Sequence, residues 1–181
     1  MKLKDILYYV KIGASLLLIC AFMAGLVSGV HSLTKETIDN YNAEKRAVAF
    51  REFFPDTVSS ALSDKTSDEV NAVYELYNAE NELIGYSVDA SASGYAGLVN
   101  IMVGITTGGE IKGIKVISHT ETKGLTSEET ASAFFLQFSG KKGSVALGSD
   151  GVEAMSGATI SSKAVTKAVQ KALALNIGEG E

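Results

Sequence analysis

The amino-acid sequence predicts an α+β protein, with a single N-terminal transmembrane helix followed by a mainly antiparallel sheet domain with flanking helices. Three observations predict this fold class. Residues 12–30 form a run of nineteen residues without a charge, pairs of β-rich segments are joined by short polar turns, and an amphipathic helix follows near the C-terminus. These features divide the chain into a cytoplasmic stub and transmembrane anchor (1–32), a helical linker (33–69) and a folded domain (70–181).

The uncharged run is long enough to cross a membrane. At about 1.5 Å per residue, a helix over 12–30 spans roughly 28 Å, close to the thickness of a bilayer's hydrocarbon core. A cleaved signal peptide is the alternative, but its apolar region is usually shorter, at about 7–15 residues. Lys2, Lys4 and Lys11 precede the run with Asp5 as the only acid, which favours a cytoplasmic N-terminus. We therefore expect a single-pass protein of the inner (cytoplasmic) membrane of the cell, with its folded domain outside the cytoplasm.

β-rich segments are predicted to form two hairpins. They are residues 72–78, 83–90, 98–107 and 110–118. Gly108-Gly109 joins the last two and is the stronger hairpin signal. Gly113, inside the last segment, indicates a β-bulge. A further short strand is predicted at 144–147.

Two helices are predicted between the anchor and the C-terminal helix. The first begins at a Thr34 cap and ends before Pro55, the only proline, and a polar loop over 59–68 follows it. The second begins at Thr126-x-x-Glu129, which has the form of a capping box.

The C-terminal amphipathic helix is predicted over 161–175. Its apolar positions recur at helical spacing on one side, which indicates that this side packs on the sheet. These positions are Val165, Ala168, Val169, Ala172 and Leu173. Ser161 or Ser162 is expected to cap its N-terminus, and Asn176 with Gly178 marks its end.

Composition excludes several classes of function. The net charge is −5, and removing the first thirty residues, with three lysines and one aspartate, leaves about −7 on the rest, which argues against nucleic acid as a partner. One cysteine, Cys20, excludes a cysteine-ligated iron–sulfur cluster, and only His31 and His119 could serve a haem or a metal as imidazole ligands. We therefore expect no metal site, and any electron transfer requires an organic cofactor.

The segment before the C-terminal helix is the most informative part of the sequence. Four residues separate Asp150-Gly151 from Ser156-Gly157-Ala158-Thr159, and the helix begins almost immediately afterwards. A helix N-terminus with free N–H groups and nearby hydroxyls is suited to an anion such as phosphate. The alternative is a simple turn of small polar residues that leads into a helix.

The wider pattern of this segment resembles the flavinylation motif of the FMN-binding domain family. In that family an FMN transferase joins the phosphate of FMN to a threonine hydroxyl as a phosphoester. The resemblance implies that Thr159 is the modified residue. The frame recognised by the transferase would be formed by Asp150, Gly151, Ser156, Gly157 and Ala158.

Two further segments resemble the same family. Gly94-Tyr95-Ala96-Gly97 precedes a strand, with Ala96 where the family has glycine. The segment that runs from His119 to Leu125 resembles the family's His-x-Glu-Thr-Pro-Gly-Leu segment, with Lys123 in place of the proline. The resemblance implies further contacts with FMN from Ser156, Gly157 and Ala158 and from Tyr95, His119, Glu121, Thr122, Gly124, Leu125 and Ser162. A catalytic acid–base pair of His119 and Glu121 is an alternative that the spacing does not favour.

Within the family, the resemblance is to the G subunits of Rnf ion-translocating electron-transport complexes. It implies a one-electron relay through covalent FMN, with no catalytic residue of its own, and membrane and peripheral partner subunits that include a second flavin subunit and iron–sulfur subunits. The C subunit of the Na⁺-translocating NADH:quinone reductase is one alternative, and a membrane-tethered binding module without covalent flavin is another. A stand-alone flavin reductase is disfavoured because the chain has no Gly-x-Gly-x-x-Gly fingerprint.

Overall fold

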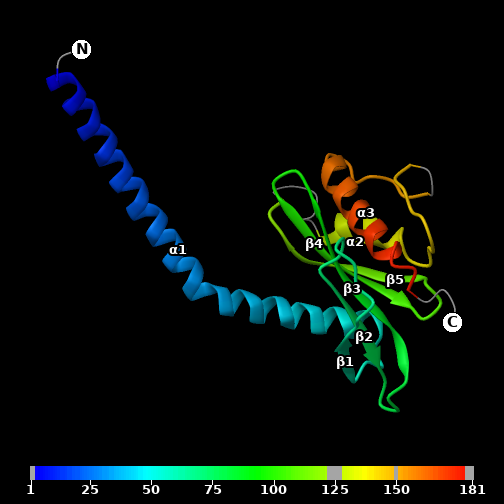
Figure 1. Cartoon of the computed structure of the whole chain (residues 1–181). Helices are drawn as coiled ribbons and strands as arrows, with labels where there is room; N and C mark the ends of the chain where they lie inside the picture. The colour runs from blue at the N-terminus through cyan, green and yellow to red at the C-terminus, as the bar shows by residue number, and fades with distance from the viewer. Residues whose placement is uncertain (1–2, 122–127, 149–150, 178–181) are drawn as a thin grey trace. The chain divides into compact units, whose positions relative to one another are not determined.

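The computed structural model describes residues 3–121, 128–148 and 151–177. Within these residues the elements follow in the order α1 (Leu3–Phe53), β1 (Ser59–Leu62), β2 (Ala72–Tyr77), β3 (Leu83–Ser93), β4 (Leu98–Thr106), β5 (Ile111–His119), α2 (Glu128–Leu136) and α3 (Thr159–Leu173) (Figure 1). The strands form one antiparallel sheet in which each pairs with its neighbour in sequence. The predicted fold class, an N-terminal apolar helix and an antiparallel sheet with flanking helices, is confirmed.

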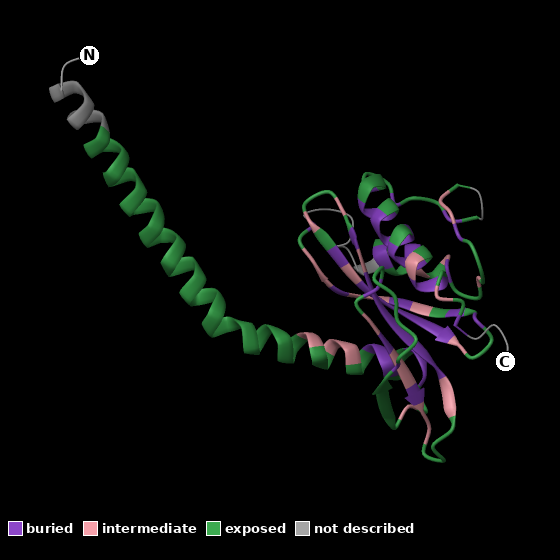
Figure 2. Ribbon diagram, viewed as in Figure 1, coloured by how far each residue is buried: buried purple, intermediate pink, exposed green. Residues whose placement is uncertain are grey.

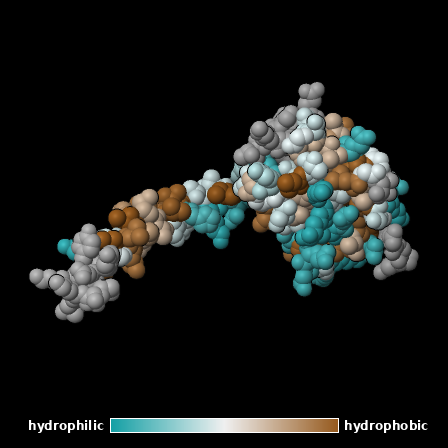
Figure 3. Space-filling view, turned by 90° about the horizontal axis from the view of Figure 1, so that it is seen from above, coloured by the Kyte–Doolittle hydropathy of each residue, from teal (hydrophilic) through white to brown (hydrophobic). Residues whose placement is uncertain are grey.

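The predicted anchor and linker helix are one continuous helix, α1. The segment Val10–Phe53 contains a stretch long and apolar enough to cross a membrane. The large apolar side chains from Val10 to Val30 are exposed (Figures 2 and 3). The expectation that Thr34 caps a separate helix is wrong, because its Oγ1 donates a 2.8 Å hydrogen bond to the carbonyl of Val30. A threonine bonded to the carbonyl four residues earlier lies inside a helix.

The chain divides into two compact units, Met1–Ala43 and Glu44–Glu181. The last turns of α1 therefore belong to the same unit as the sheet, and they help to build its core.

α2 and α3 cover one face of the sheet. The stripe predicted for the C-terminal helix is confirmed, since all five of its apolar residues are buried. They share one core with side chains that alternate along the central strands, such as Val88, Ile101 and Val103. Phe134 of α2 and Phe138 just after it add an edge-to-face ring pair with centroids 5.2 Å apart.

The end of α1 covers the opposite face, where glycines leave room for two phenylalanine rings. We call Gly85, Gly104 and Gly113 the glycine floor. A Cβ at Gly104 would lie 2.6 Å from Cδ2 of Phe53, and one at Gly113 would lie 2.9 Å from Cδ1 of the same ring. At Gly85, a Cβ would lie 2.3 Å from Cζ of Phe54. The second core therefore depends on strands without side chains at these points.

Polar contacts also join the end of α1 to the sheet. Nε of Arg46 lies 3.1 Å from Oδ2 of Asp89, and Nδ2 of Asn71 donates to its Oδ1 at 2.8 Å. Nζ of Lys45 donates to the carbonyl of Ile117 at 3.0 Å. Asp89 is only 3% exposed, so Arg46 and Asn71 take the place of water around its carboxyl group.

The strand predictions hold except at two places. Part of the predicted loop 59–68 is the edge strand β1, whose exposed residues are held by pairing with β2. The strand predicted at 144–147 does not form, and Leu147 makes only an isolated bridge with Val152. The predicted bulge is confirmed, because the pairing of β5 with β4 skips Lys112 beside Gly113.

The predicted ends of α2 and α3 can be compared with the structure only where the residues are described. α2 is confirmed from Glu128, whereas Thr126 lies outside the described residues. α3 ends at Leu173, and Asn176, three residues later, has the left-handed conformation expected just after a helix, with φ 48°. Gly178 lies outside the described residues.

Candidate functional site

Thr159 is the first residue of α3, and its side chain is exposed. Ala158 occupies the N-cap position, and among the described residues no side chain caps this helix. The expected cap at Ser161 or Ser162 is wrong, because both serines lie buried inside the first turn. The first N–H groups of the helix have no partner within it, so they can bind an anion at this end.

Thr159 follows a compact turn over residues 155–158, and the buried side chain of Ser162 bonds both ends of that turn. The N–H of Ala158 donates to the carbonyl of Met155 at 3.1 Å. Oγ of Ser162 accepts the N–H of Met155 at 2.9 Å and donates to the carbonyl of Ala158 at 3.0 Å. Gly157 has φ +73°, a conformation that glycine adopts without strain. Ser156 and Gly157 are exposed, so the outer side of the turn is accessible.

The segment before the turn is attached to the end of α2. Gln137, just after α2, accepts the N–H of Glu153 at 2.7 Å and donates to its carbonyl at 3.3 Å. Val152 is buried, and Gly151 has φ +71°. Asp150, the first residue of the motif, lies outside the described residues.

Glu121 connects the three segments that the sequence singles out. Its Oε1 accepts the N–H of Ala96 at 2.9 Å, and its Oε2 accepts a short hydrogen bond from Oγ of Ser161. Burial of the carboxyl opposes ionisation, but the bonds from Ser161 and from the N–H groups of Ala96 and Tyr95, with the nearby imidazole of His119, hold the pKa of Glu121 below its ordinary value. The site therefore contains a buried, ionised carboxylate.

Two glycines let the loop over residues 94–97 approach this carboxylate. A Cβ at Gly94 would lie 2.5 Å from Oε1 of Glu121, and a Cβ at Gly97 would lie 2.2 Å from Oγ1 of Thr120. The N–H of Gly94 also closes the loop by donating to the carbonyl of Gly97 at 2.7 Å. Larger residues at either position would push the loop away from the end of β5.

The remaining site residues differ in how far they are described. Tyr95 is 74% exposed on its loop. His119 is half-buried at the end of β5, and its Nδ1 is buried without a hydrogen-bond partner among the described residues. Three expected flavin contacts lie outside the described residues: Thr122, Gly124 and Leu125.

Sequence reasoning missed the role of Ser161 as the partner of Glu121. A signal was present, because a serine two residues after Thr159 stands on the opposite side of a helix, where a buried hydroxyl needs a partner.

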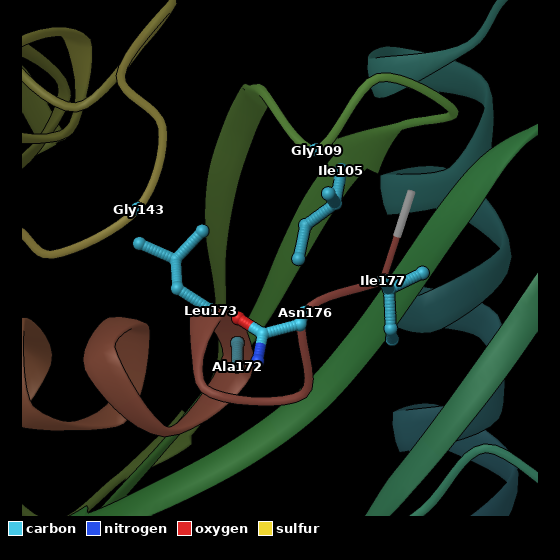
Figure 4. Close-up of a pocket in the computed structure, with 7 residues that line it drawn as sticks. All are labelled: Ile105, Gly109, Gly143, Ala172, Leu173, Asn176 and Ile177. Carbon is cyan, nitrogen blue, oxygen red and sulfur yellow. The ribbon is translucent and has the colours of Figure 1, made fainter. Parts of the chain in front are cut away.

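A hollow elsewhere in the domain does not match this site. It lies at the C-terminal end of α3 and is lined by residues such as Ala172, Asn176 and Ile177 (Figure 4). Its volume is about 10 Å³, room for about one water molecule. Leu173 lines this hollow, and it lies fourteen residues after Thr159 in the same helix, about 21 Å along the helix axis. The surface around Thr159 is therefore the site that the motif and the contacts indicate.

Comparison with known proteins supports the same region. The FMN-binding domain family model matches residues 94–174. The chain is 31% identical to the G subunit of the Na⁺-translocating ferredoxin:NAD⁺ oxidoreductase complex of Acetobacterium woodii, over 90% of this chain and 89% of that protein. It is 34% identical to the proton-translocating counterpart of Clostridium ljungdahlii, over 65% and 69%, and 29% identical to the G subunit of the ion-translocating oxidoreductase complex of Escherichia coli K12, over 90% and 88%. The chain therefore belongs to the FMN-binding domain family, together with the G subunits of ion-translocating oxidoreductase complexes.

Proposed function

We propose that this chain is the electron-transfer subunit of a membrane-bound, Rnf-type ferredoxin:NAD⁺ oxidoreductase complex and carries FMN on Thr159 through a phosphoester bond. The observation that carries the proposal is the exposed Thr159 hydroxyl at the uncapped start of α3. The matched family domain includes this residue, and the relatives are named as subunits of such complexes.

The residues at the site fit a phosphate. In the attachment step a bond would form between Oγ of Thr159 and the flavin-side phosphorus of a flavin dinucleotide. The phosphoanhydride bond of that donor would break, and the nucleoside monophosphate would leave as the hydroxyl proton is released. The first N–H groups of α3 then hold the phosphate oxygens, where the helix dipole also favours negative charge. Exposed Ser156 and Gly157 leave the turn open to the FMN transferase.

Bound FMN supplies the redox chemistry, because a flavin exchanges one or two electrons. The chain holds and orients the cofactor, and we assign it no independent catalytic activity. Tyr95 and His119 stand near the site through their links to Glu121, which makes them suitable neighbours for the flavin ring.

The apolar α1 and the names of the relatives support a membrane location and partner subunits. We place the protein in the cell membrane as a single-pass subunit, with a cytoplasmic N-terminus and the flavin domain on the other side. Residues 12–30 contain no ionisable side chain apart from Cys20, so the ion path belongs to partner subunits. Those partners include a second flavin subunit and iron–sulfur subunits.

Intact-mass measurement of the full chain, extracted from cells that contain the FMN transferase, tests the proposal. The wild type should gain the mass of FMN less one water, and Thr159→Ala should gain nothing. Thr107→Ala removes another exposed threonine, in the β4–β5 turn, and should be modified like the wild type. An unmodified wild type, or a modified Thr159→Ala variant, contradicts the proposal.

A further inference from the structure

We infer that Glu121 is a positioning residue for the Thr159 site: its carboxylate joins the 94–97 loop to the first turn of α3 and is not itself a ligand of the flavin. The inference rests on the proposed function only in taking Thr159 as the attachment residue.

Both oxygens of Glu121 already have protein partners. Oε1 accepts from the N–H of Ala96, and Oε2 accepts from the hydroxyl of Ser161. The residue is 5% exposed, and Gly94 packs so closely that a Cβ there would lie 2.5 Å from Oε1. A group this enclosed is closed to a ligand that arrives at the surface, and its bonds serve the protein itself.

The bonds of Glu121 connect distant parts of the chain. Ala96 belongs to the loop between β3 and β4, 25 residues away in sequence, and Ser161 belongs to α3, 40 residues away. Glu121 follows closely after the end of β5. One carboxylate thus fixes the loop and the helix start to the same end of the sheet.

The helix geometry explains how this contact positions Thr159. Two residues at about 100° each place Ser161 on the opposite side of the helix from Thr159. Ser161 is buried and Thr159 is exposed. Glu121 therefore holds the inner side of the turn while Thr159 projects outward.

Hydrogen–deuterium exchange on the unmodified full chain, produced without the transferase, tests the connection directly. Glu121→Ala should speed exchange at least about tenfold in both the 94–97 loop and the start of α3, because each loses a bond to a charged group. Ser161→Ala, which alters only the helix side, should also speed exchange in the loop. Glu121→Gln keeps an acceptor for Ala96 and should lie between the wild type and Glu121→Ala.

Glu75→Gln is the matched control. Glu75 accepts hydrogen bonds from Ser63 and Tyr77 at 2.8 and 2.6 Å, and these bonds, with that from Tyr77 the stronger cause, lower its pKa as well. It lies on β2, away from the site, so its variant should change exchange in neither site segment. The inference is overturned if Glu121→Gln and Ser161→Ala exchange at the wild-type rate in both segments. It is also overturned if Glu75→Gln speeds exchange there as much as these variants do. Both outcomes can be read even if Glu121→Ala does not fold.

The same variants, produced with the transferase, test the effect on the flavin. Glu121→Ala and Ser161→Ala should carry attached flavin with lower fluorescence anisotropy than the wild type, whereas Glu75→Gln should match the wild type. Unchanged anisotropy despite faster exchange refutes the positioning role. A wild type without flavin refutes the proposed function instead, and the exchange data still decide whether Glu121 makes the connection.

Discussion

Gly104→Ala tests whether the glycine floor is needed for the packing of α1. The new Cβ would lie 2.6, 2.7 and 2.9 Å from Cδ2, Cγ and Cβ of Phe53, whereas carbon atoms pack comfortably at about 3.5–4.0 Å. The ring would have to retreat by roughly 1 Å inside a core with few voids. Such overpacking costs about 1–3 kcal/mol. An alanine that fits without strain would instead stabilise the protein by about 0.4–1 kcal/mol. The change in unfolding free energy therefore has opposite signs in the two cases, so its sign shows whether Gly104 is needed for the packing of Phe53.

The assay is thermal unfolding of the detergent-solubilised full chain, followed by near-ultraviolet circular dichroism of its tyrosines. Each kcal/mol should lower the Tm by about 3–5 °C for a domain of this size. Gly108→Ala is the control, because the nearest atom to its Cβ would be Oγ1 of Thr106 at 3.7 Å. Phe53→Leu should relieve part of the loss in the double variant, with a coupling above about 0.5 kcal/mol. A Tm for Gly104→Ala at or above that of Gly108→Ala would refute the reasoning.

Three other variants have expected outcomes. Arg46→Ala should lower the free energy of unfolding by about 2 kcal/mol, because it leaves the buried Asp89 without its cation; in the Asp89→Asn background, chemical denaturation should find a smaller loss. The lowered pKa of Glu121 means that its contribution is present above the ordinary glutamate pKa, about 4.3, and is lost as the pH falls through the lower folded-state value. The difference in unfolding free energy between the wild type and Glu121→Gln should therefore shrink between about pH 6 and pH 3, and a constant difference would contradict this. Gly157→Ala should cost about 1–2 kcal/mol because φ is +73°, and Gly157→Asn should cost less in the same denaturation assay.

The sequence predicted best those elements whose signals are local. The stripe of α3 and the Gly108-Gly109 hairpin depend on spacing and turn chemistry within a few residues, and both are present in the structure. β1 was missed because its side chains are exposed and its stability comes from backbone pairing with β2. No local pattern marks such a strand, since its partner lies outside the segment itself.

The sequence predicts where the candidate site lies, but it does not predict how the residues around that site are connected. The motif predicts Thr159 as the attachment residue. From the sequence alone, however, Ser161 and Ser162 look like helix caps and do not show which partners they bond. Ser162 instead bonds the turn at Met155, and Ser161 bonds a carboxylate 40 residues earlier. Both contacts depend on where the sheet brings α3 and the end of β5 together, which is a property of the tertiary fold.

The two-sided burial of the central strands limits how β3 and β4 can pair. Asp89 faces the end of α1 with Met102 opposite it, while the neighbouring pair of Val88 and Val103 faces α3. A slip of one residue along β3 would turn Asp89 into an aliphatic environment and remove it from Arg46. The same slip would turn apolar side chains of β3, such as Val88, toward Arg46 on the α1 face. An incorrectly aligned hairpin is therefore penalised on both faces at once, so the alignment seen here excludes its nearest competitors.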